Sequence, residues 1–583
     1  MGYKLYLAIA VAGIAYLVRT TYFPPIVNSP IVEISTGKLQ GKISLSRDGR
    51  NYFEYLAIPY AQPPVGKLRY ESPERFTKKW DGIRDATKAG SSCIQMDLIM
   101  GRIEGSEDCL FVNVHTPKIG KDAKLPVLVW IHGGIFAFGS GNSYHGDYFM
   151  DEDVVLVTVN YRLASFGFLN SGDGVVRGNM GLKDQSMALQ WVQDNIERFG
   201  GNKNDVTLIG ESAGGASVHF QILSPMSKGL FHKAIAQSGL ATMPWAVYPH
   251  PAKQAKRFAQ QLNCPVGNTQ EMVKCLKSKE AMDIVQVHRE MKDNLRPVIA
   301  TFVPTVEMDK SDGKAFLLDM PRRIIESGNY NKVPFFTGVN NAEGLMMSAP
   351  AVANSTITHG LLNAWDKTVE NIMLMPEDTP PVVYEKVKAF YMHGNGLDLN
   401  NPMAHYENLT NLFSDWLWNL GFHNALTSHA QVEGPPLFIY YYAYQGDFGL
   451  DQLLLALKGG YHPLVEIMWS KVSKWFKTTV LGQTIERHGS CHGDELAMEF
   501  FMPMMASVPK GSVDYEFSKK FVKLIVQFAK LDLKLKKSPV LEFLGKVWTP
   551  QEKNSELKYM KLNWRPEMIS EPFKDRIDFW QSL

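Results

Sequence analysis

Short, continuous apolar runs are the feature of this chain that most restricts its fold. Three of them occupy residues 127–131, 154–159 and 206–209. Strands that are apolar on both faces are typical of parallel sheets, because helices cover such sheets on both sides. Between the last two runs, residues 184–199 repeat large apolar side chains near the 3.6-residue period of a helix. The alternation predicts an α/β fold with a large, mostly parallel central sheet covered by helices.

The rest of the chain adds further expected strands and helices and shows no boundary between domains. Further strands are expected at residues 333–337 and 437–444, and a late amphipathic helix at 515–533. Residues 345–430 have a helical but irregular pattern. A length of 583 residues would by itself suggest three or four ordinary domains. No linker rich in proline, glycine and serine separates such domains, so we expect one domain with long insertions over residues 23–583.

The amino terminus has the pattern of a secretory signal. Residues 5–18 are apolar and are flanked by Lys4 and Arg19. As a helix, this run would rise about 21 Å, which is short of the length that spans a bilayer. We therefore assign residues 1–22 to a signal peptide or an uncleaved signal-anchor. The expected location is the secretory pathway, either secreted or in the lumen of the endoplasmic reticulum. The alternative is a protein attached to the membrane through this segment.

The charge balance excludes one class of partner. Lysine and arginine number 61 and aspartate and glutamate 59, so the formal net charge is +2. No strong field of either sign follows, and we expect no nucleic-acid partner. The cysteine spacings also do not resemble a zinc site, so no metal is expected.

A pentapeptide, GESAG at residues 210–214, indicates where chemistry could occur. An expected strand precedes it and a helix-compatible run, residues 213–223, follows it. This is the strand–turn–helix context of a nucleophile elbow, in which a strained turn exposes the serine hydroxyl above the sheet. Ser212 is the candidate nucleophile, and the amide of Ala213 could stabilise a developing oxyanion at the start of the helix. The alternative is a glycine-rich turn with an inert serine.

A second glycine-containing turn follows the first expected strand. The segment IHGGIF covers residues 131–136. Glycines allow a backbone to turn its N–H groups toward a carbonyl oxygen, and a His-Gly-Gly turn after a strand is typical of the other half of an oxyanion hole. Read with Ser212, the segment predicts the opposite wall of the same pocket.

Four segments, together with these motifs, carry a family resemblance. They read AIPYAQPPVG at 57–66, EDCLFVNV at 107–114, VNYR at 159–162 and GESAGGAS at 210–217. With them the chain resembles the type-B carboxylesterase/cholinesterase family of α/β-hydrolases, and is most similar to the insect carboxylesterases. The likeness runs from about residue 30 to the end. It implies the α/β-hydrolase fold and a serine carboxylesterase that needs no cofactor.

The resemblance also implies a catalytic triad in the chain order Ser–Glu–His. The nucleophile is Ser212, the acid Glu343 in GVNNAEG at 338–344, and the base His492 in CHGDEL at 491–496. From the residues alone, a solvated loop carboxylate is the less favoured alternative for Glu343, and His488 is the nearest rival base. The implied reaction is acyl transfer in two steps through an acyl-enzyme. The backbone amides of Gly134, Ile135 and Ala213 would hold the oxyanion.

Five cysteines leave at least one thiol unpaired. Two pairs of these cysteines lie close together in the sequence, but proximity does not prove that either pair is bonded. Disulfides are chemically reasonable in a chain with a secretory signal. The family resemblance implies pairing of Cys93 with Cys109 and of Cys264 with Cys275. Cys491 would then be free, and we interpret it as a buried structural thiol. Two weak glycosylation signals stand at Asn354 and Asn408.

Three departures from the family pattern restrict the range of expected substrates. Ile135 stands where a third glycine is common, which favours short acyl groups. Ile99 stands where cholinesterases have a tryptophan, so a cation–π site for choline is missing. Glu211 replaces the glutamine usual in juvenile hormone esterases. By analogy Trp245 lines the acyl side, although a plain core tryptophan is equally compatible.

We therefore expect a small-molecule ester substrate that is neutral and moderately apolar. Xenobiotics, odorant or pheromone esters and lipid-derived hormone esters belong to this class. The alternatives are a juvenile hormone esterase-like enzyme, a non-catalytic cholinesterase-like adhesion protein, and a lipase working at interfaces.

Overall fold

The computed structural model describes most of the chain. The described residues are 26–97, 101–291, 302–308, 313–376, 378–393, 401–447, 449–456, 463–476, 480–482, 487–502, 508–532 and 539–583. The expected signal segment, residues 1–22, and Ile99 lie outside these ranges. Among the helices of the described ranges, none has the length and apolar character needed to cross a membrane.

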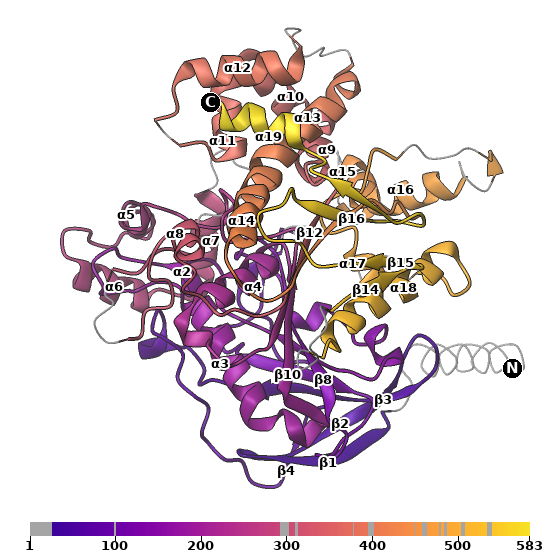
Figure 1. Ribbon diagram of the computed structural model, residues 1–583. Helices are drawn as coiled ribbons and strands as arrows, with labels where there is room; N and C mark the ends of the chain where they lie inside the picture. Colours follow the sequence, from indigo (N-terminus) through magenta and orange to yellow (C-terminus); the bar gives the residue numbers. More distant parts are fainter. Residues whose placement is uncertain are drawn as a thin grey trace, which may run out of the picture.

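One 13-stranded sheet forms the centre of the molecule (Figure 1). Its parallel part consists, in spatial order, of β9 (Val155–Val159), β8 (Leu125–Ile131), β10 (Gly201–Glu211), β11 (Lys233–Gln237), β12 (Phe335–Asn340), β13 (Leu437–Tyr442) and β16 (Lys558–Leu562). Antiparallel strands extend both edges: β1 (Asn28–Ile34), β2 (Gly37–Leu45), β3 (Asn51–Pro59) and β7 (Phe111–Thr116) on one side, β17 (Glu567–Ser570) on the other. The thirteenth strand, β4 (Ile83–Asp85), pairs in parallel with β2. The prediction of a large, mostly parallel sheet is confirmed.

Strand β8 shows why the apolar runs indicated burial on both faces. Its side chains alternate between two separate cores, because successive residues of a strand point to opposite faces. Val127, Val129 and Ile131 belong to the larger core, and Leu128 and Trp130 to the smaller one. All five are buried. A strand with polar residues at either set of positions would leave unpaired polar groups in one of these cores.

Helices cover each face of the sheet. On the larger core lie α3 (Met180–Asn195) and α4 (Ala213–Leu223), and on the smaller core lies α18 (Val513–Ala529). Helix α18 begins two residues before its expected start, since Ser512 Oγ accepts from the Tyr515 N–H at 3.1 Å and caps it. It ends at Ala529 rather than at the predicted residue 533.

Two other predicted boundaries are also shifted. The strand expected at residues 333–337 is β12, which starts only at Phe335, because the preceding Pro334 has no N–H to donate to a sheet. The helix expected from residue 184 begins at Met180 and continues as a 3-10 turn, Ile196–Phe199. The types of element were predicted correctly at all these places.

Long helical insertions lie beyond the carboxyl ends of the parallel strands (Figure 1). Between β12 and β13 the chain forms α9 (Leu345–Ala353), α10 (Ser355–Asn363), α11 (Trp365–Met373), α12 (Pro381–Met392), α13 (Tyr406–Ser414) and α14 (Leu420–Gln431). Between β11 and β12 it forms α5 (Pro251–Gln261), α6 (Thr269–Ser278), α7 (Ala281–Glu290) and α8 (Pro321–Ser327). Parallel strands bring their carboxyl ends to one edge, where ligands bind in open α/β sheets.

Candidate active site

Ser212 occupies a strained turn between β10 and α4. Its φ of 58° and ψ of −124° lie in a region that non-glycine residues rarely adopt. Two glycines make room for this turn. A Cβ on Gly214 would come within 2.0 Å of the Ile131 carbonyl oxygen, and one on Gly239 within 1.8 Å of the Ser212 carbonyl oxygen. The Ser212 N–H donates to Gln237 O at 2.8 Å, which ties the turn to the neighbouring strand β11.

The three predicted triad side chains meet at this edge of the sheet. The Ser212 hydroxyl lies 2.8 Å from His492 Nε2, and Glu343 Oε2 lies 2.6 Å from His492 Nδ1. All three residues are buried. Glu343 follows strand β12, and its other oxygen accepts from the Asn340 N–H at 2.6 Å. This order of contacts lets Nδ1–H donate to Glu343 while Nε2 accepts the serine proton.

The rival histidine is not part of this chain of hydrogen bonds. The ring of His488 packs edge-on against Tyr406, with centroids 4.9 Å apart. Of the two histidines, His492 is the one within hydrogen-bond distance of Ser212.

The predicted oxyanion donors have free N–H groups. Gly134, with φ of 101°, and Ile135, with φ of 53°, turn the backbone after strand β8. Within the described ranges, neither of these N–H groups, nor that of Ala213, has a protein acceptor. Donors that are held in place without a partner are what a developing oxyanion requires. Ile135 is a β-branched residue in the left-handed region, which is a strained conformation for such a side chain.

Glu211 brings a second carboxylate to the histidine. Its Oε1 lies 3.3 Å from His492 Nε2 and has no hydrogen-bond partner among the described residues. Burial, reinforced by the nearby Glu495 and Glu343, raises the pKa of Glu211 to about 8, although His492 opposes the shift. Burial disfavours the charged form of His492, but Glu211 and Glu343 outweigh it and raise the pKa of this imidazole to about 9. The site therefore stabilises the imidazolium that proton transfer from a serine would create.

Replacing Glu211 with Gln is expected to shift the pH dependence of ester hydrolysis. The neutral amide removes one attraction for the imidazolium, so the pKa of His492 should fall. Because only neutral imidazole can accept the serine proton, kcat/KM rises as His492 loses its proton, and the rise should move to lower pH in the variant. Initial rates with an aryl acetate from pH 5 to 10 check this. An unshifted profile would mean that Glu211 is already neutral in the wild type.

A deeper layer of carboxyl groups was missed by sequence reasoning. Glu495 accepts from Ser238 Oγ at 3.3 Å and from Asn340 Nδ2, and Glu499 accepts from Gln237 Nε2 at 2.5 Å. Burial raises the pKa of Glu495 to about 7 and that of Glu499 well above its ordinary value. These groups connect the ends of the strands to the loop that carries His492. No local pattern in the sequence distinguishes them from solvated glutamates.

Trp418 is a further wall residue that the sequence did not indicate. Its ring lies 4.9 Å from the His492 ring, centroid to centroid. It belongs to a π-helical turn, Asp415–Asn419, between α13 and α14, and such turns are frequent at functional sites. The predicted acyl-side residue Trp245 is buried and donates from Nε1 to Leu417 O at 2.9 Å. Trp245 is thus fixed directly behind this turn.

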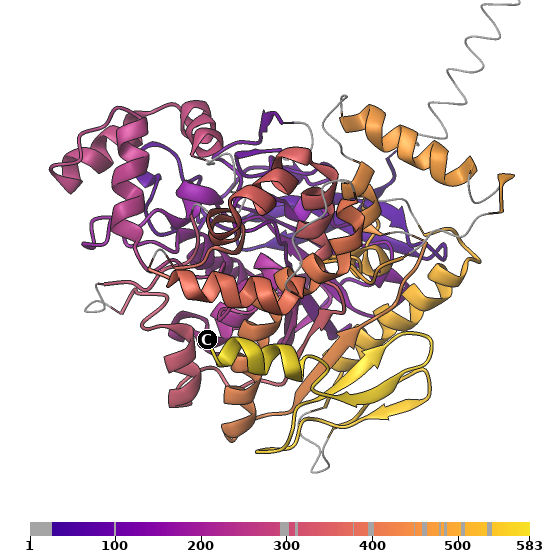
Figure 2. The same cartoon turned by 90° about the horizontal axis from the view of Figure 1, so that it is seen from above.

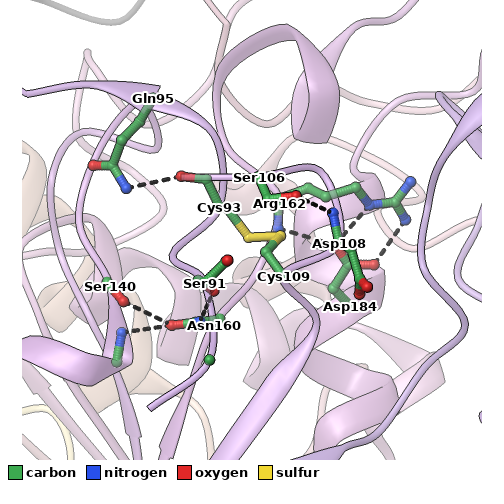
Figure 3. The surroundings of a disulfide bond; sticks show 12 residues. Ser91, Cys93, Gln95, Ser106, Asp108, Cys109, Ser140, Asn160, Arg162 and Asp184 are labelled. Carbon is green, nitrogen blue, oxygen red and sulfur yellow. Dashed lines mark hydrogen bonds and ion pairs between the residues drawn. A yellow bond between two sulfur atoms is a disulfide. The ribbon is translucent and has the colours of Figure 1, made fainter. Parts of the chain in front are cut away.

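Both expected disulfides are present. Cys93 is bonded to Cys109 and Cys264 to Cys275. Figure 3 shows Gln95 beside the first bridge. Its Nε2 donates to Cys93 O and to Gly139 O, both at 2.9 Å, and its Oε1 accepts from the Gly139 N–H at 2.7 Å. The bridged loop therefore holds the end of the turn that carries the predicted oxyanion donors.

Asn160 fastens the residues that follow Gly139 at the same end of the turn (Figure 3). Its Oδ1 accepts from Ser140 Oγ at 3.0 Å and from the Gly141 N–H at 2.8 Å, while its Nδ2 donates to Ser91 O at 3.2 Å. Two residues further along the chain, Arg162 forms a buried ion pair with Asp184. Its Nε donates to Oδ2 at 2.8 Å and its Nη2 to Oδ1 at 2.7 Å. Two residues of the VNYR segment, Asn160 and Arg162, therefore hold neighbouring loops in place around the candidate site.

Cys491 is free and buried beside the histidine. Burial raises the pKa of its thiol well above the ordinary value, so the thiol stays protonated. This agrees with the interpretation of a structural thiol. Among the described residues, no cluster of three or more His, Cys, Asp or Glu is placed to hold a metal ion.

The two glycosylation signals differ in their surroundings. Asn354 is exposed just after α9, whereas Asn408 is half-buried within α13. The hydroxyl of Thr410, which completes the second signal, is buried and donates to Tyr406 O at 2.7 Å. Accessibility thus favours Asn354 of the two.

The chain is similar to several known proteins over most of its length. A model of the carboxylesterase family matches residues 28–580. Venom carboxylesterase-6 of Apis mellifera is 38% identical over 476 residues, which are 80% of this chain and 80% of that protein. A carboxylic ester hydrolase of Bombus ignitus is 40% identical over 437 residues, or 73% and 77% of the two chains.

A solved structure extends the likeness to the whole fold. Juvenile hormone esterase from Manduca sexta, crystallised with OTFP covalently attached, superposes with a TM-score of 0.76 at 25% identity. The match covers 96% of this chain and 99% of that one. The match therefore extends over nearly the full length of both chains.

Proposed function

Because this chain belongs to the carboxylesterase family, an α/β-hydrolase family, we propose that it hydrolyses neutral, moderately apolar carboxylic esters through Ser212, Glu343 and His492. The observation that carries the proposal is the unbroken hydrogen-bond chain from the Ser212 hydroxyl through the His492 ring to Glu343. It is the arrangement that activates a serine as a nucleophile.

In the first step the ester carbonyl carbon is attacked by Ser212 Oγ, and the hydroxyl proton passes to His492 Nε2. The carbonyl oxygen becomes an oxyanion, which the N–H groups of Gly134, Ile135 and Ala213 stabilise. Collapse of this intermediate breaks the bond to the alcohol, which leaves with the proton returned by His492. The product of this step is an ester between Ser212 and the acyl group.

Water completes the cycle in the second step. His492 takes a proton from the water, whose oxygen attacks the acyl carbon, and then returns the proton to Ser212 Oγ as the carboxylic acid leaves. Glu343 accepts from Nδ1–H throughout and stabilises the imidazolium. No step needs a metal or an organic cofactor.

Serine labelling and a substrate profile test this proposal. An organophosphonate ester should inactivate the enzyme with one equivalent, and mass spectrometry of a digest should place the adduct on Ser212. Initial rates across acetate, butyrate and hexanoate esters of one phenol, and across acetates of longer alcohols, would define the preference. An adduct on another serine, with activity lost, would contradict the assignment.

Replacing Ile135 with Gly is expected to extend the range of acyl chains. We propose that the branched side chain, in the turn that would hold the oxyanion, narrows the space for the acyl group. Glycine also relieves the left-handed backbone at this position. We expect the ratio of kcat/KM for the hexanoate ester to that for the acetate ester to rise by at least roughly tenfold, the lower end of the effect of one methylene in an apolar pocket. Rates on the acetate serve as the internal control. Unchanged chain-length selectivity would contradict the idea.

A second candidate function is hydrolysis of juvenile hormone esters. The similarity to juvenile hormone esterase from Manduca sexta favours it, whereas Glu211, in place of the glutamine expected for that group, does not. Competition between a juvenile hormone and an aryl acetate for the purified enzyme distinguishes the two functions. A non-catalytic adhesion role would be indicated only if pure, folded protein turned over neither.

The two disulfides are typical of proteins that fold in the secretory pathway. We infer that residues 1–22 direct the chain there as a signal peptide or signal-anchor and that residues 23–583 form one catalytic domain. Sequencing the amino terminus of the protein from expressing cells would show whether this segment has been cleaved off or is retained as an anchor.

A further inference from the structure

Helix α16 (Pro463–Trp475) has its polarity reversed relative to an ordinary surface helix. Its solvent side is apolar: Trp469 is 73% exposed and Met468 67%, and Val472 and the adjoining Phe476 are exposed as well. At 100° per residue these four side chains fall within an arc of about 100°, so they form one stripe. Val480 and Leu481, which follow the helix in the chain, are also exposed.

The opposite side of α16 is polar and faces the protein. Glu466 is buried, Ser470 and Ser473 are half-buried, and Lys474 Nζ donates to Asp447 O. A helix of a soluble protein normally places its apolar stripe on the core. In α16 the apolar stripe has no protein partner among the described residues. Burial in the core of this chain therefore does not explain why these exposed positions are apolar.

The position of α16 connects this surface to the candidate active site. Figures 1 and 2 show the helix projecting from the body of the molecule. It packs on α15 (Leu450–Ala456), which in turn packs on α9, the helix that follows Glu343. The Leu450 N–H donates to Asp494 Oδ1 at 2.8 Å, two residues after His492. The stripe is thus carried by the elements that hold the acid and the base.

The stripe is too small for a stable contact with a second protein. Standard interfaces use about 20–30 residues on each side, whereas six exposed apolar residues are found here among the described side chains. Its composition suits a lipid surface, where tryptophan, phenylalanine and methionine insert at the headgroup boundary. Residues 463–482 also contain three lysines, of which Lys474 faces the protein, and one glutamate, which is buried. The remaining charge is positive and complements anionic lipids.

We propose that α16 docks the enzyme on anionic lipid bilayers, with Met468, Trp469 and Val472 inserted among the lipid headgroups. Docking brings the helices behind the candidate site to the bilayer surface, where apolar esters concentrate. The proposal concerns binding alone and does not depend on catalysis.

A label on the stripe tests insertion directly. In the full chain, Val472→Cys labelled with an NBD maleimide should gain fluorescence on vesicles of phosphatidylcholine with 30% phosphatidylserine. The free Cys491 is buried, so the wild type should take up no label. The matched control is Val382→Cys, an equally exposed valine on α12. A probe at residue 472 that responds no more than the control would overturn the proposal, whatever other part of the chain meets the vesicle.

A double substitution tests the contribution of the stripe to affinity. Met468→Ser with Trp469→Ser should weaken partitioning onto the same vesicles at least about tenfold. Met282→Ser with Val382→Ser, on two other exposed helices, should leave it unchanged. Light scattering after gel filtration reports the alternative occupant. The proposal would be overturned if the wild type were a dimer that only the Met468→Ser, Trp469→Ser variant converts to a monomer. It would also be overturned if both double variants bound the vesicles equally well.

Discussion

Replacing Ser212 with Ala is expected to lower kcat for an aryl acetate by roughly a millionfold, the scale seen when the nucleophile of a serine hydrolase is removed. Without Oγ there is no atom to form the acyl-enzyme, and His492 has no hydroxyl proton to accept. Donors in the oxyanion turn would still polarise a bound ester, so a small residual rate above that of water should remain. Steady-state rates with phenyl acetate measure the loss.

Ser238→Ala is the matched control for this experiment. Ser238 follows the adjacent strand β11 and, like Ser212, has a positive φ, of 49°. Its hydroxyl contacts Glu495 rather than a histidine. We expect the Ser238 variant to retain activity within about tenfold, since a single hydrogen bond contributes only about 1 kcal/mol. Thermal unfolding of both variants checks that each is folded. A Ser212→Ala enzyme with more than a thousandth of wild-type kcat would show that another group is the nucleophile.

Replacing Glu343 with Gln is expected to lower kcat by about ten-thousandfold, although the two side chains have nearly the same shape. Glu343 has two acceptor oxygens in use, one for the Asn340 N–H and one for His492 Nδ1–H. An amide has only one. When its oxygen accepts from Asn340, its NH2 group faces Nδ1 and forces the ring proton onto Nε2. That tautomer cannot accept the proton of the serine.

A pH profile separates this tautomer effect from simple loss of structure. Removing the carboxylate also removes an attraction for the imidazolium, so the remaining activity should rise at a lower pH than in the wild type. Glu343→Asp keeps the charge and should recover part of the rate. Glu211 cannot replace Glu343, because it approaches Nε2 and not Nδ1. A Gln variant with at least a tenth of wild-type kcat would remove Glu343 from the proposed triad.

Much of the fold could be predicted because its signals are local. The apolar runs around Val129 and Ile209 identified strands buried on both sides, and these are β8 and β10. Boundaries were less accurate where single residues decide them. Pro334 delays the start of β12, and Ser512 advances the start of α18 by capping it. Such effects depend on one missing donor or one extra acceptor, which an apolar pattern does not register.

Other parts of the site were not predictable, because they arise from contacts between distant segments. Glu211 was noticed as a departure from a motif, yet its approach to His492 Nε2 follows from how the loop after β13 returns to the sheet. Trp418 belongs to an insertion whose sequence has no motif, and only packing sets its ring against the histidine. The reversed polarity of α16 is likewise invisible until one side of the helix is seen to face the protein.

The sequence by itself determined the conformation of the turn at Ser212. A buried strand, a helix, and glycines at 210 and 214 permit few backbone paths, since steric limits act between near neighbours in the chain. The tertiary structure alone decided that Ser212 and His492, 280 residues apart, come within 2.8 Å. Strand order in the sheet sets that distance, and strand order is a property of long-range pairing rather than of any segment.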